Sequence, residues 1–265
     1  MNQTLRTLAI TVICFLLYYI AFEKFEPIML LADRVVHYRL LSYFITYWVI
    51  GIPIFIGTLL INENHRVFRK LGLGANPLTA LLLAAVFALP MFIGGLIFYP
   101  ISSSLSFPNL VAGTLFAGFF EELYFRGFLF GQVFRNTKLG FLPSIFLGAV
   151  IFACGHLYQS QDAGELAGIF ITTFMGAIFF AWLFVEWNYN LWVPIFLHTL
   201  MNLAWQLFDV SDNALGNVNS NIFRGLTIAL AIIITIVYKR RTGQKLAVNR
   251  DTIWIKQKLP HHSLS

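Results

Sequence analysis

The sequence predicts an all-α fold, a polytopic transmembrane helix bundle of about eight helices. Of 265 residues, 58% are hydrophobic and 11% are charged, whereas a soluble domain is about half apolar and a quarter charged. The mean hydropathy is +0.74. Apolar runs repeatedly approach the roughly 17–25 residues that a helix needs to cross a bilayer. Only helices and closed barrels can span lipid, and runs of this length favour helices.

The apolar runs predict spans near residues 7–22, 38–61, 78–101, 108–130, 141–158, 166–187, 190–208 and 222–238. The first resembles a signal peptide but lacks an Ala-x-Ala-like cleavage site, so we expect a retained helix. Residues 28–36 are predicted to form an interfacial or re-entrant segment. The length of the chain predicts a single membrane-embedded domain over residues 1–265, with a basic cytoplasmic tail at 239–265.

Lysine and arginine are distributed unevenly between the two sides of this topology. If the N-terminus is inside, the inner segments hold thirteen of them and the outer loops hold four, namely Lys24, Arg34, Arg39 and Arg224. The positive-inside rule therefore predicts that both termini are cytoplasmic. The basic tail then suits contact with anionic lipid better than contact with nucleic acid. We expect a multi-pass protein of the cell membrane, and the sequence gives no oligomeric state.

A few polar residues interrupt otherwise apolar spans. Span 108–130 contains Glu121, Glu122 and Arg126, span 141–158 contains His156, and span 190–208 contains His198 and Asn202. A charge at the centre of a membrane helix costs about 2.5–3.5 kcal/mol on insertion scales. Residues that carry such a cost are candidates for a functional site.

Helical spacing separates these residues by role. Glu122 and Arg126 are four apart and can pair within one helix, whereas Glu121 has no such partner. Small residues at spacings of four from Glu121, Ala117 and Gly113, would let another helix approach. His198 and Asn202 share one face of their helix. An unpaired carboxylate, two imidazoles and a carboxamide could therefore meet inside the bilayer.

Such a set could hydrolyse an amide. A carboxylate beside an imidazole can hold and deprotonate water, and a histidine with an asparagine can donate hydrogen bonds to an oxyanion. Each part also has a structural interpretation, because membrane ion pairs and single histidines often only join helices, and buried ionisable groups also mark ion pathways. One glutamate with two histidines is a possible zinc set. No HExxH motif is present, so ligand spacing does not decide the matter.

The expected span boundaries create a difficulty. If span 108–130 runs inward and span 141–158 runs outward, Glu121 and His156 each lie about 20 Å from the start of their helix, toward opposite surfaces. The two side chains meet only if the first helix is longer or the second begins later.

Three motifs resemble those of the CPBP intramembrane proteases, which include CAAX prenyl endopeptidases, lysostaphin-resistance proteins and bacteriocin-immunity proteins. They are Glu-Glu-x-x-x-Arg at 121–126, Phe-x-x-x-His at 152–156 and His-x-x-x-Asn at 198–202, within a catalytic motif core of about 108–208. The resemblance implies that Glu121 and His156 activate water and that His198 and Asn202 stabilise the oxyanion. It also implies that Glu122 and Arg126 shape the site, with Arg126 attracting a substrate carboxylate.

The resemblance implies an intramembrane endopeptidase acting on a membrane-associated peptide or protein, without requiring that the substrate is prenylated. Two alternatives remain, a non-catalytic bacteriocin-immunity or scaffold protein and a small proton-coupled transporter. We expect no cofactor. The alternative is a zinc ion bound by Glu121, His156 and His198. In that case Asn202 would be the only motif residue left to stabilise the oxyanion. The metal-free glutamate mechanism gives every motif residue a separate role.

Overall fold

A computed structural model describes residues 2–62 and 66–256 of the chain. Across that part every element is helical, and the one β-type pairing is an isolated bridge between Leu139 and Ile255. The predicted all-α class is therefore confirmed. The last part of the expected basic tail, residues 257–265, lies outside the described residues.

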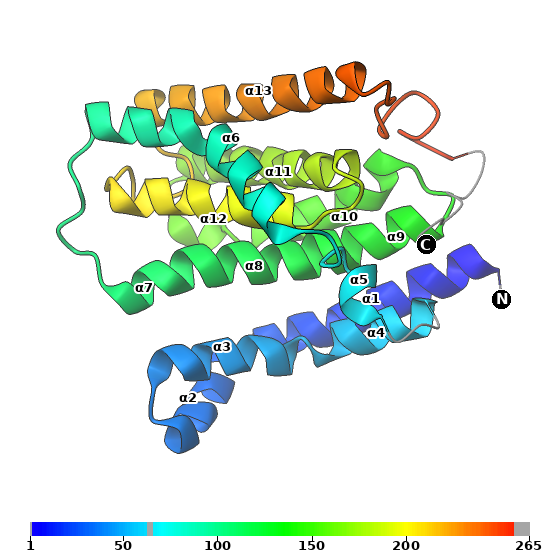
Figure 1. Cartoon of the computed structure of the whole chain (residues 1–265). Coiled ribbons are helices and arrows are strands. Elements are labelled where there is room, and N and C mark those ends of the chain that lie inside the picture. Colours follow the sequence, from blue (N-terminus) through cyan, green and yellow to red (C-terminus); the bar gives the residue numbers. More distant parts are fainter. Residues whose placement is uncertain (1, 63–65, 257–265) are drawn as a thin grey trace.

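The chain passes back and forth along the bundle as the hydropathy pattern predicted (Figure 1). The long passes are α1 (Gln3–Phe22), α3 with α4 (Arg39–Ile50, Ile52–Asn62), α6 (Pro77–Phe98), a segmented helix from Phe107 to Asn136, α10 (Phe141–Cys154), α11 (Ala163–Glu186), α12 (Trp192–Leu207) and α13 (Val218–Arg241). Short helices α2 (Phe25–Val36), α5 (Val67–Lys70) and η3 (Leu157–Gln159) connect them.

Six of these passes are long and apolar enough to cross a membrane, among the residues that the structure describes. The other two expected spans correspond to the segmented helix and to α12, which has 16 residues. These two carry most of the polar candidates, whose side chains replace apolar ones there and lower the hydropathy. The protein is thus a multi-pass membrane protein.

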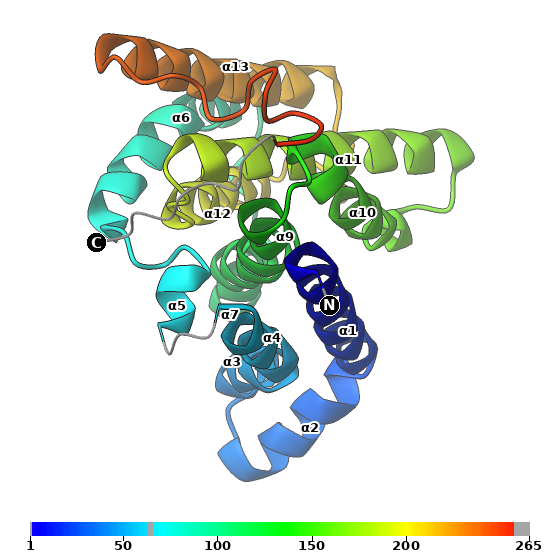
Figure 2. The same ribbon diagram turned by 90° about the vertical axis from the view of Figure 1, so that its right-hand side faces the viewer.

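The segmented helix forms the centre of the bundle (Figures 1 and 2). It alternates between α-helical and π-helical turns without a break in direction: α7 (Phe107–Val111), η1 (Ala112–Phe116), α8 (Ala117–Glu121), η2 (Glu122–Phe130) and α9 (Gly131–Asn136). It contacts α1, α10 and α12 along its length. Because π-helical turns occur often at functional sites, their position beside Glu121 and Glu122 indicates where the polar groups act.

Aromatic side chains fill the interface between this central helix and the N-terminal helices. Phe120 stacks on Tyr47 of α3 with ring centroids 4.4 Å apart, and Tyr124 donates a 2.6 Å hydrogen bond to the carbonyl of Tyr47. Gly51, between α3 and α4, makes that approach possible, because a Cβ there would lie 2.3 Å from the Tyr124 hydroxyl. Burial of such large rings is the main stabilising contribution in this region.

The length of the central helix resolves the difficulty with span boundaries. It continues to Asn136, beyond the expected end at 130, while α10 begins at Phe141 as expected. Glu121 therefore lies near the middle of a long helix rather than near its end. Phe152 of α10 reaches the level of Arg126, with the guanidinium carbon 4.4 Å from the ring centroid.

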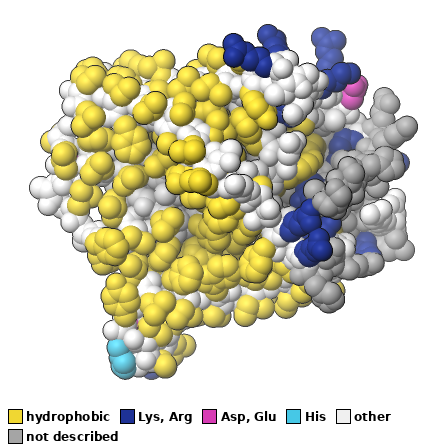
Figure 3. Space-filling model, in the orientation of Figure 1, with side chains coloured by type: hydrophobic (Ala, Val, Ile, Leu, Met, Phe, Trp, Pro, Cys, Tyr) yellow, Lys and Arg dark blue, Asp and Glu magenta, His cyan; other side chains and the backbone are white. Residues whose placement is uncertain are grey.

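The start of α1 and the end of α13 lie at the same end of the bundle, where lysine and arginine side chains gather (Figures 1 and 3). Helix α2, expected as an interfacial or re-entrant piece, is a 12-residue helix at the opposite end (Figure 1). By the positive-inside rule the basic end faces the cytoplasm, and this orientation stays a prediction.

Candidate active site

Glu122 and Arg126 form the predicted ion pair in the interior of the bundle. Arg126 Nε lies 3.3 Å from Glu122 Oε2, and both residues are fully buried. The guanidinium group also lies over the ring of Phe152 and, at 5.6 Å, over that of Phe180. Contact with aromatic faces compensates part of the lost hydration of the cation. Arg126 therefore supports the site from behind and has no surface that a substrate could touch.

His198 of α12 lies between the two glutamates. Its Nδ1 is 2.8 Å from Glu122 Oε1, and its Nε2 is 3.9 Å from Glu121 Oε2. The ring stacks on Phe180 of α11 at a centroid distance of 5.1 Å and an interplanar angle of 12°. The carboxylate of Glu122 thus joins Arg126 on its own helix to His198 on another. Spacing along one helix could not reveal this contact between helices.

His156 lies two residues after the end of α10 and is half-buried. Its Nδ1 lies 2.7 Å from the carbonyl oxygen of Phe152, and its ring packs against the Phe152 ring at 4.6 Å. A carbonyl oxygen can only accept, so Nδ1 carries the proton. The same reasoning applies to His198, whose Nδ1 faces the carboxylate of Glu122. Both histidines therefore leave Nε2 free for other partners.

The contacts of α10 with the central helix place His156 at the height of the glutamates. A Cβ on Gly148 would lie 3.1 Å from Leu129, and one turn further along α10 Phe152 contacts Arg126. The helices run in opposite directions, so the next turn of α10 lies level with the turn that precedes Arg126. That turn contains Glu121 and Glu122.

Asn202, one turn after His198 on α12, faces the central helix. Its Nδ2 donates a 3.1 Å hydrogen bond to the carbonyl of Gly113. The second amide hydrogen stays available, because an asparagine side chain has two. The carboxamide and His198 therefore lie on the same side of α12, as their spacing predicted.

Glycines let α12 come close to the central helix. A Cβ on Gly113 would lie 2.4 Å from Nε2 of Gln206, and a Cβ on Gly118 would lie 2.4 Å from Oγ1 of Thr199. Gly113 was expected in this role together with Ala117. The structure shows Gly113 in this role, and it adds Gly118, whose Cβ would also lie 2.9 Å from the backbone nitrogen of Thr199. The π-helical turn between them shifts the face that a strict spacing of four would select.

Several polar atoms of the site make no hydrogen bond to any described residue. These buried atoms are Glu121 Oε2, Glu122 Oε2, the three guanidinium nitrogens of Arg126 and Thr199 Oγ1. Buried polar atoms are almost always paired in proteins. The Glu121 side chain is 29% exposed, so this carboxylate is the one that a reactant could reach.

The expected alternative zinc set does not fit the arrangement of the side chains. Across residues 2–62 and 66–256, no group of three or more His, Cys, Asp or Glu side chains is placed to hold a metal ion. His198 Nε2 lies 3.9 Å from Glu121 Oε2. The Nδ1 atom of His156, in contrast, contacts the backbone carbonyl of Phe152 at 2.7 Å.

Helices outside the motif region pack against the central helix on both sides of Glu121. Tyr47 of α3 stacks on Phe120, Tyr43 of α3 stacks on Phe116 at a centroid distance of 6.2 Å, and Tyr18 of α1 contacts Tyr124 at 4.7 Å. The motif analysis named none of these tyrosines of α1 and α3. Their only signal in the sequence is the spacing of four between Tyr43 and Tyr47, which puts two hydroxyl-bearing rings on one face of α3.

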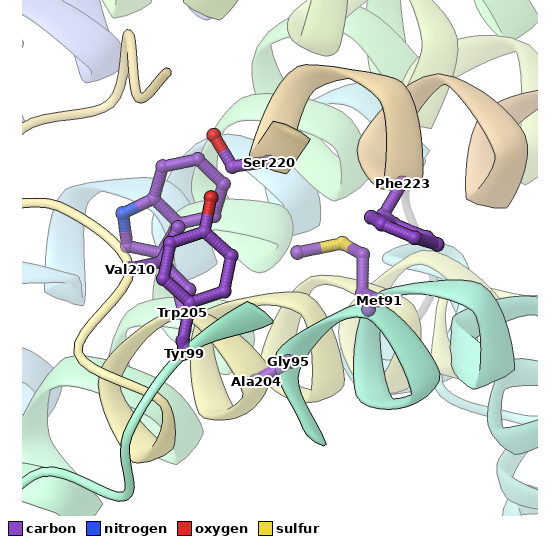
Figure 4. A pocket seen from close by; sticks show the side chains of 9 residues that line it. Met91, Gly95, Tyr99, Ala204, Trp205, Val210, Ser220 and Phe223 are labelled. Atoms are coloured by element: carbon purple, nitrogen blue, oxygen red, sulfur yellow. The ribbon is translucent and has the colours of Figure 1, made fainter. Parts of the chain in front are cut away.

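A small pocket lies apart from these residues, between α6, α12 and α13 (Figure 4). Its lining is mostly apolar and consists of Met91, Gly94, Gly95, Tyr99, Ala204, Trp205, Val210, Ser220 and Phe223. None of the polar candidates contributes to it, so this pocket is not the candidate active site.

Comparison with known proteins supports the resemblance seen in the motifs. Residues 102–204, about two-fifths of the chain, match the model of the type II CAAX prenyl endopeptidase Rce1-like family. No curated protein and no solved structure gives a significant match. The matched segment contains every candidate residue, and it supports assignment to the CPBP/CAAX protease family.

Proposed function

We propose that the protein is an intramembrane endopeptidase that hydrolyses a peptide bond of a membrane-associated peptide or protein. The family match supports a CAAX-type protease in general. The observation that carries the proposal is the position of His198, with one ring nitrogen bound by Glu122 and the other directed toward Glu121. An ion pair that only joined helices would not need a second, partly exposed carboxylate beside it.

In the proposed reaction Glu121 and His156 hold the attacking water. Nε2 of His156 is the free acceptor on that ring, because Nδ1 is bonded to the Phe152 carbonyl. A water held between this nitrogen and the Glu121 carboxylate would give a proton to Glu121 as the water oxygen attacks the carbonyl carbon. That proton then passes to the amine nitrogen when the C–N bond breaks, which leaves a carboxylic acid and an amine.

His198 and Asn202 are proposed to stabilise the oxyanion of the tetrahedral intermediate. The free hydrogen of the Asn202 amide supplies one donor. Nε2 of His198 supplies the second only when the ring carries a proton on each nitrogen. The carboxylates of Glu122 and Glu121 face these two nitrogens and hold the ring in place, and a donor with a fixed position stabilises the charge that develops on the oxygen.

The proposal is tested with purified protein in proteoliposomes and membrane-anchored peptide substrates. Glu121→Gln keeps the shape of the side chain and removes the base, so cleavage should fall by about 10²–10⁴-fold, the usual contribution of such a group. Glu26→Gln changes an exposed glutamate on α2 and should cleave like the unaltered protein. Full activity of Glu121→Gln would refute this assignment of the base.

The natural substrate can be sought by mass spectrometry of membranes from cells with the unaltered protein and with Glu121→Gln. A peptide terminus that occurs only with the unaltered protein identifies the cleaved bond. If purified protein and cells both show no cleavage with either form, the site instead serves binding, as in an immunity or scaffold protein.

A further inference from the structure

The segment from Ala247 to Lys256, which we call the strap, follows α13 and crosses the basic end of the bundle. It was expected as part of a cytoplasmic tail. Its backbone is bound on both sides, to the end of α11 and to the start of α10. Ala247 and Val248 also pack against the main hydrophobic core.

Glu186, the last residue of α11, holds the beginning of the strap. Its carboxylate accepts hydrogen bonds of 3.0 and 2.9 Å from the backbone N–H groups of Ala247 and Val248. It also lies 3.3 Å from Nζ of Lys239 on α13. Glu186 is only 1% exposed. A buried carboxylate with three donors is a strong anchor, because charge-assisted hydrogen bonds are about twice as strong as neutral ones.

The far half of the strap completes the first turn of α10. The first N–H groups of a helix have no acceptor within the helix, and the residue before α10, Gly140, has no side chain to supply one. The N–H groups of Gly140, Phe141 and Leu142 donate instead to backbone carbonyls of the strap, at Trp254, Thr252 and Ile253 respectively, over 2.6 to 2.9 Å.

The last described residue fastens the strap to the central helix. The N–H of Lys256 donates to the carbonyl of Lys138 at 2.8 Å, and its Nζ donates to the carbonyl of Phe134 on α9. The Lys256 ammonium group also lies over the Phe134 ring at 4.3 Å. The strap thus joins α9, α10, α11 and α13 at one end of the bundle.

Helix α10 connects the strap to the candidate site. It has 14 residues, with the strap at its first turn and His156 just beyond its last. Along its length it packs on the central helix at Gly148 and Phe152. A rotation or shift of its first turn would therefore move His156 relative to Glu121.

We propose that the strap is a positioning element for the reaction: by binding the first turn of α10 it fixes the height and rotation of that helix, and so the place of His156 beside Glu121. The effect on turnover rests on the proposed peptidase function. The effect of the strap on the structure of α10 is independent of that function.

The test uses Gly140→Ala in the full chain. Gly140 has φ −75° and ψ −174°, which alanine adopts without strain. Its Cβ would lie 2.4 to 2.5 Å from backbone atoms of Trp254, so the substitution displaces the strap and little else. Gly225→Ala on α13 is the matched control, because a Cβ there has no neighbour within 4 Å.

Hydrogen exchange and steady-state kinetics give the two measurements. In Gly140→Ala, exchange of the Phe141 and Leu142 amides and of residues 247–256 should rise by about tenfold or more. The kcat should fall by about tenfold or more while KM changes far less, because His156 holds the attacking water in the proposed reaction and does not bind the substrate. Gly225→Ala should match the unaltered protein in both. Thr252→Val, which removes a 2.7 Å hydrogen bond within the strap, should give a smaller change in the same direction.

Unchanged exchange at Phe141 and Leu142 in both strap variants would overturn the proposal. Raised exchange with an unchanged kcat would also overturn it, because the strap would then stabilise α10 without positioning His156. If the unaltered protein cleaves nothing, the proposed function fails separately, while the exchange data still decide whether the strap holds α10. If Gly140→Ala does not fold, hydrogen exchange and kcat of Thr252→Val decide whether the strap positions α10.

Discussion

At the scale of single residues, the adjacent glutamates Glu121 and Glu122 have opposite environments. Glu122 is fully buried and bound to both Arg126 and His198, whereas the Glu121 side chain is 29% exposed and lies at 3.9 Å from its nearest ionic partner. A helix turns by about 100° per residue, so neighbours in sequence point in different directions. One carboxylate therefore supports the site, and the other is available to a reactant.

Substitution of each glutamate should separate stability from activity. Glu122→Gln leaves Arg126 as a buried charge without its partner, which should cost about 3–5 kcal/mol of unfolding free energy. Glu121→Gln should change this free energy far less, while lowering cleavage by about 10²–10⁴-fold. Thermal and denaturant unfolding in detergent measures the unfolding free energy of the two variants, and the cleavage assay measures their activity. Equal destabilisation by the two substitutions would contradict this division of roles.

Hydrolysis should also proceed without a bound metal. The proposed roles use Glu121 and His156 for water and His198 and Asn202 for the oxyanion, so a metal would remove groups that the reaction needs. Activity should survive exhaustive chelation, and elemental analysis should find far less than one metal ion per chain. Stoichiometric zinc whose removal abolishes activity, and whose return restores it, would make Glu121, His156 and His198 ligands instead.

At the scale of helices, the site depends on how closely α12 approaches the central helix. Gly118→Ala would place a Cβ 2.4 Å from Thr199 Oγ1 and 2.9 Å from the Thr199 backbone nitrogen. The backbone of α12 must then move, which should cost about 1–3 kcal/mol and lower turnover, because His198 is the preceding residue. Gly176→Ala on α11, with no atom within 4 Å of the added Cβ, should change neither the unfolding free energy nor the cleavage rate.

The strap should bind more tightly as pH rises. Burial lowers the pKa of Lys256 from 10.5 to about 8. Between these values the released strap holds more protons than the bound strap, so raising the pH through this range favours binding. Hydrogen exchange of residues 247–255, corrected for intrinsic rates, should slow from pH 8 to about pH 10. Lys256→Met should remove this dependence, and faster corrected exchange at high pH would contradict it.

At the scale of the whole molecule, the topology rests on where basic side chains gather. Single cysteines at the exposed residues Ser103 and Gln161 should react with an impermeant reagent added outside, and one at exposed Lys138 should not. Cys14 and Cys154 must first be replaced, because Cys154 is exposed. Labelling in the reverse pattern would invert the assigned orientation and place the strap outside the cell.

Hydropathy predicted the course of the chain well, because the requirement for apolar length acts on each span separately. The expected span 166–187 corresponds to α11 at Ala163–Glu186, and the span 38–61 corresponds to the pair α3 and α4. The ion pair of Glu122 with Arg126 was predictable for a similar reason, since both residues lie on one helix.

The remaining features depend on contacts between distant segments, which spacing along one helix does not contain. The bond from His198 to Glu122 joins residues 76 positions apart. The strap binds Glu186 through backbone N–H groups, which carry no signature in the side-chain sequence. The π-helical turns likewise depend on how the central helix packs against its neighbours.

The π-helical segment Glu122–Phe130 has a consequence for sequence alignment with proteins of the Rce1-like family. A π-type turn contains one residue more than the α-helical turn that it replaces. A relative whose helix is regular here would span the same distance with fewer residues. The correct alignment of the two would then place a gap inside a membrane helix, downstream of the paired glutamates. Methods that forbid gaps within helices would misplace every residue between that gap and the next loop, including the equivalents of Gly131 and Gln132.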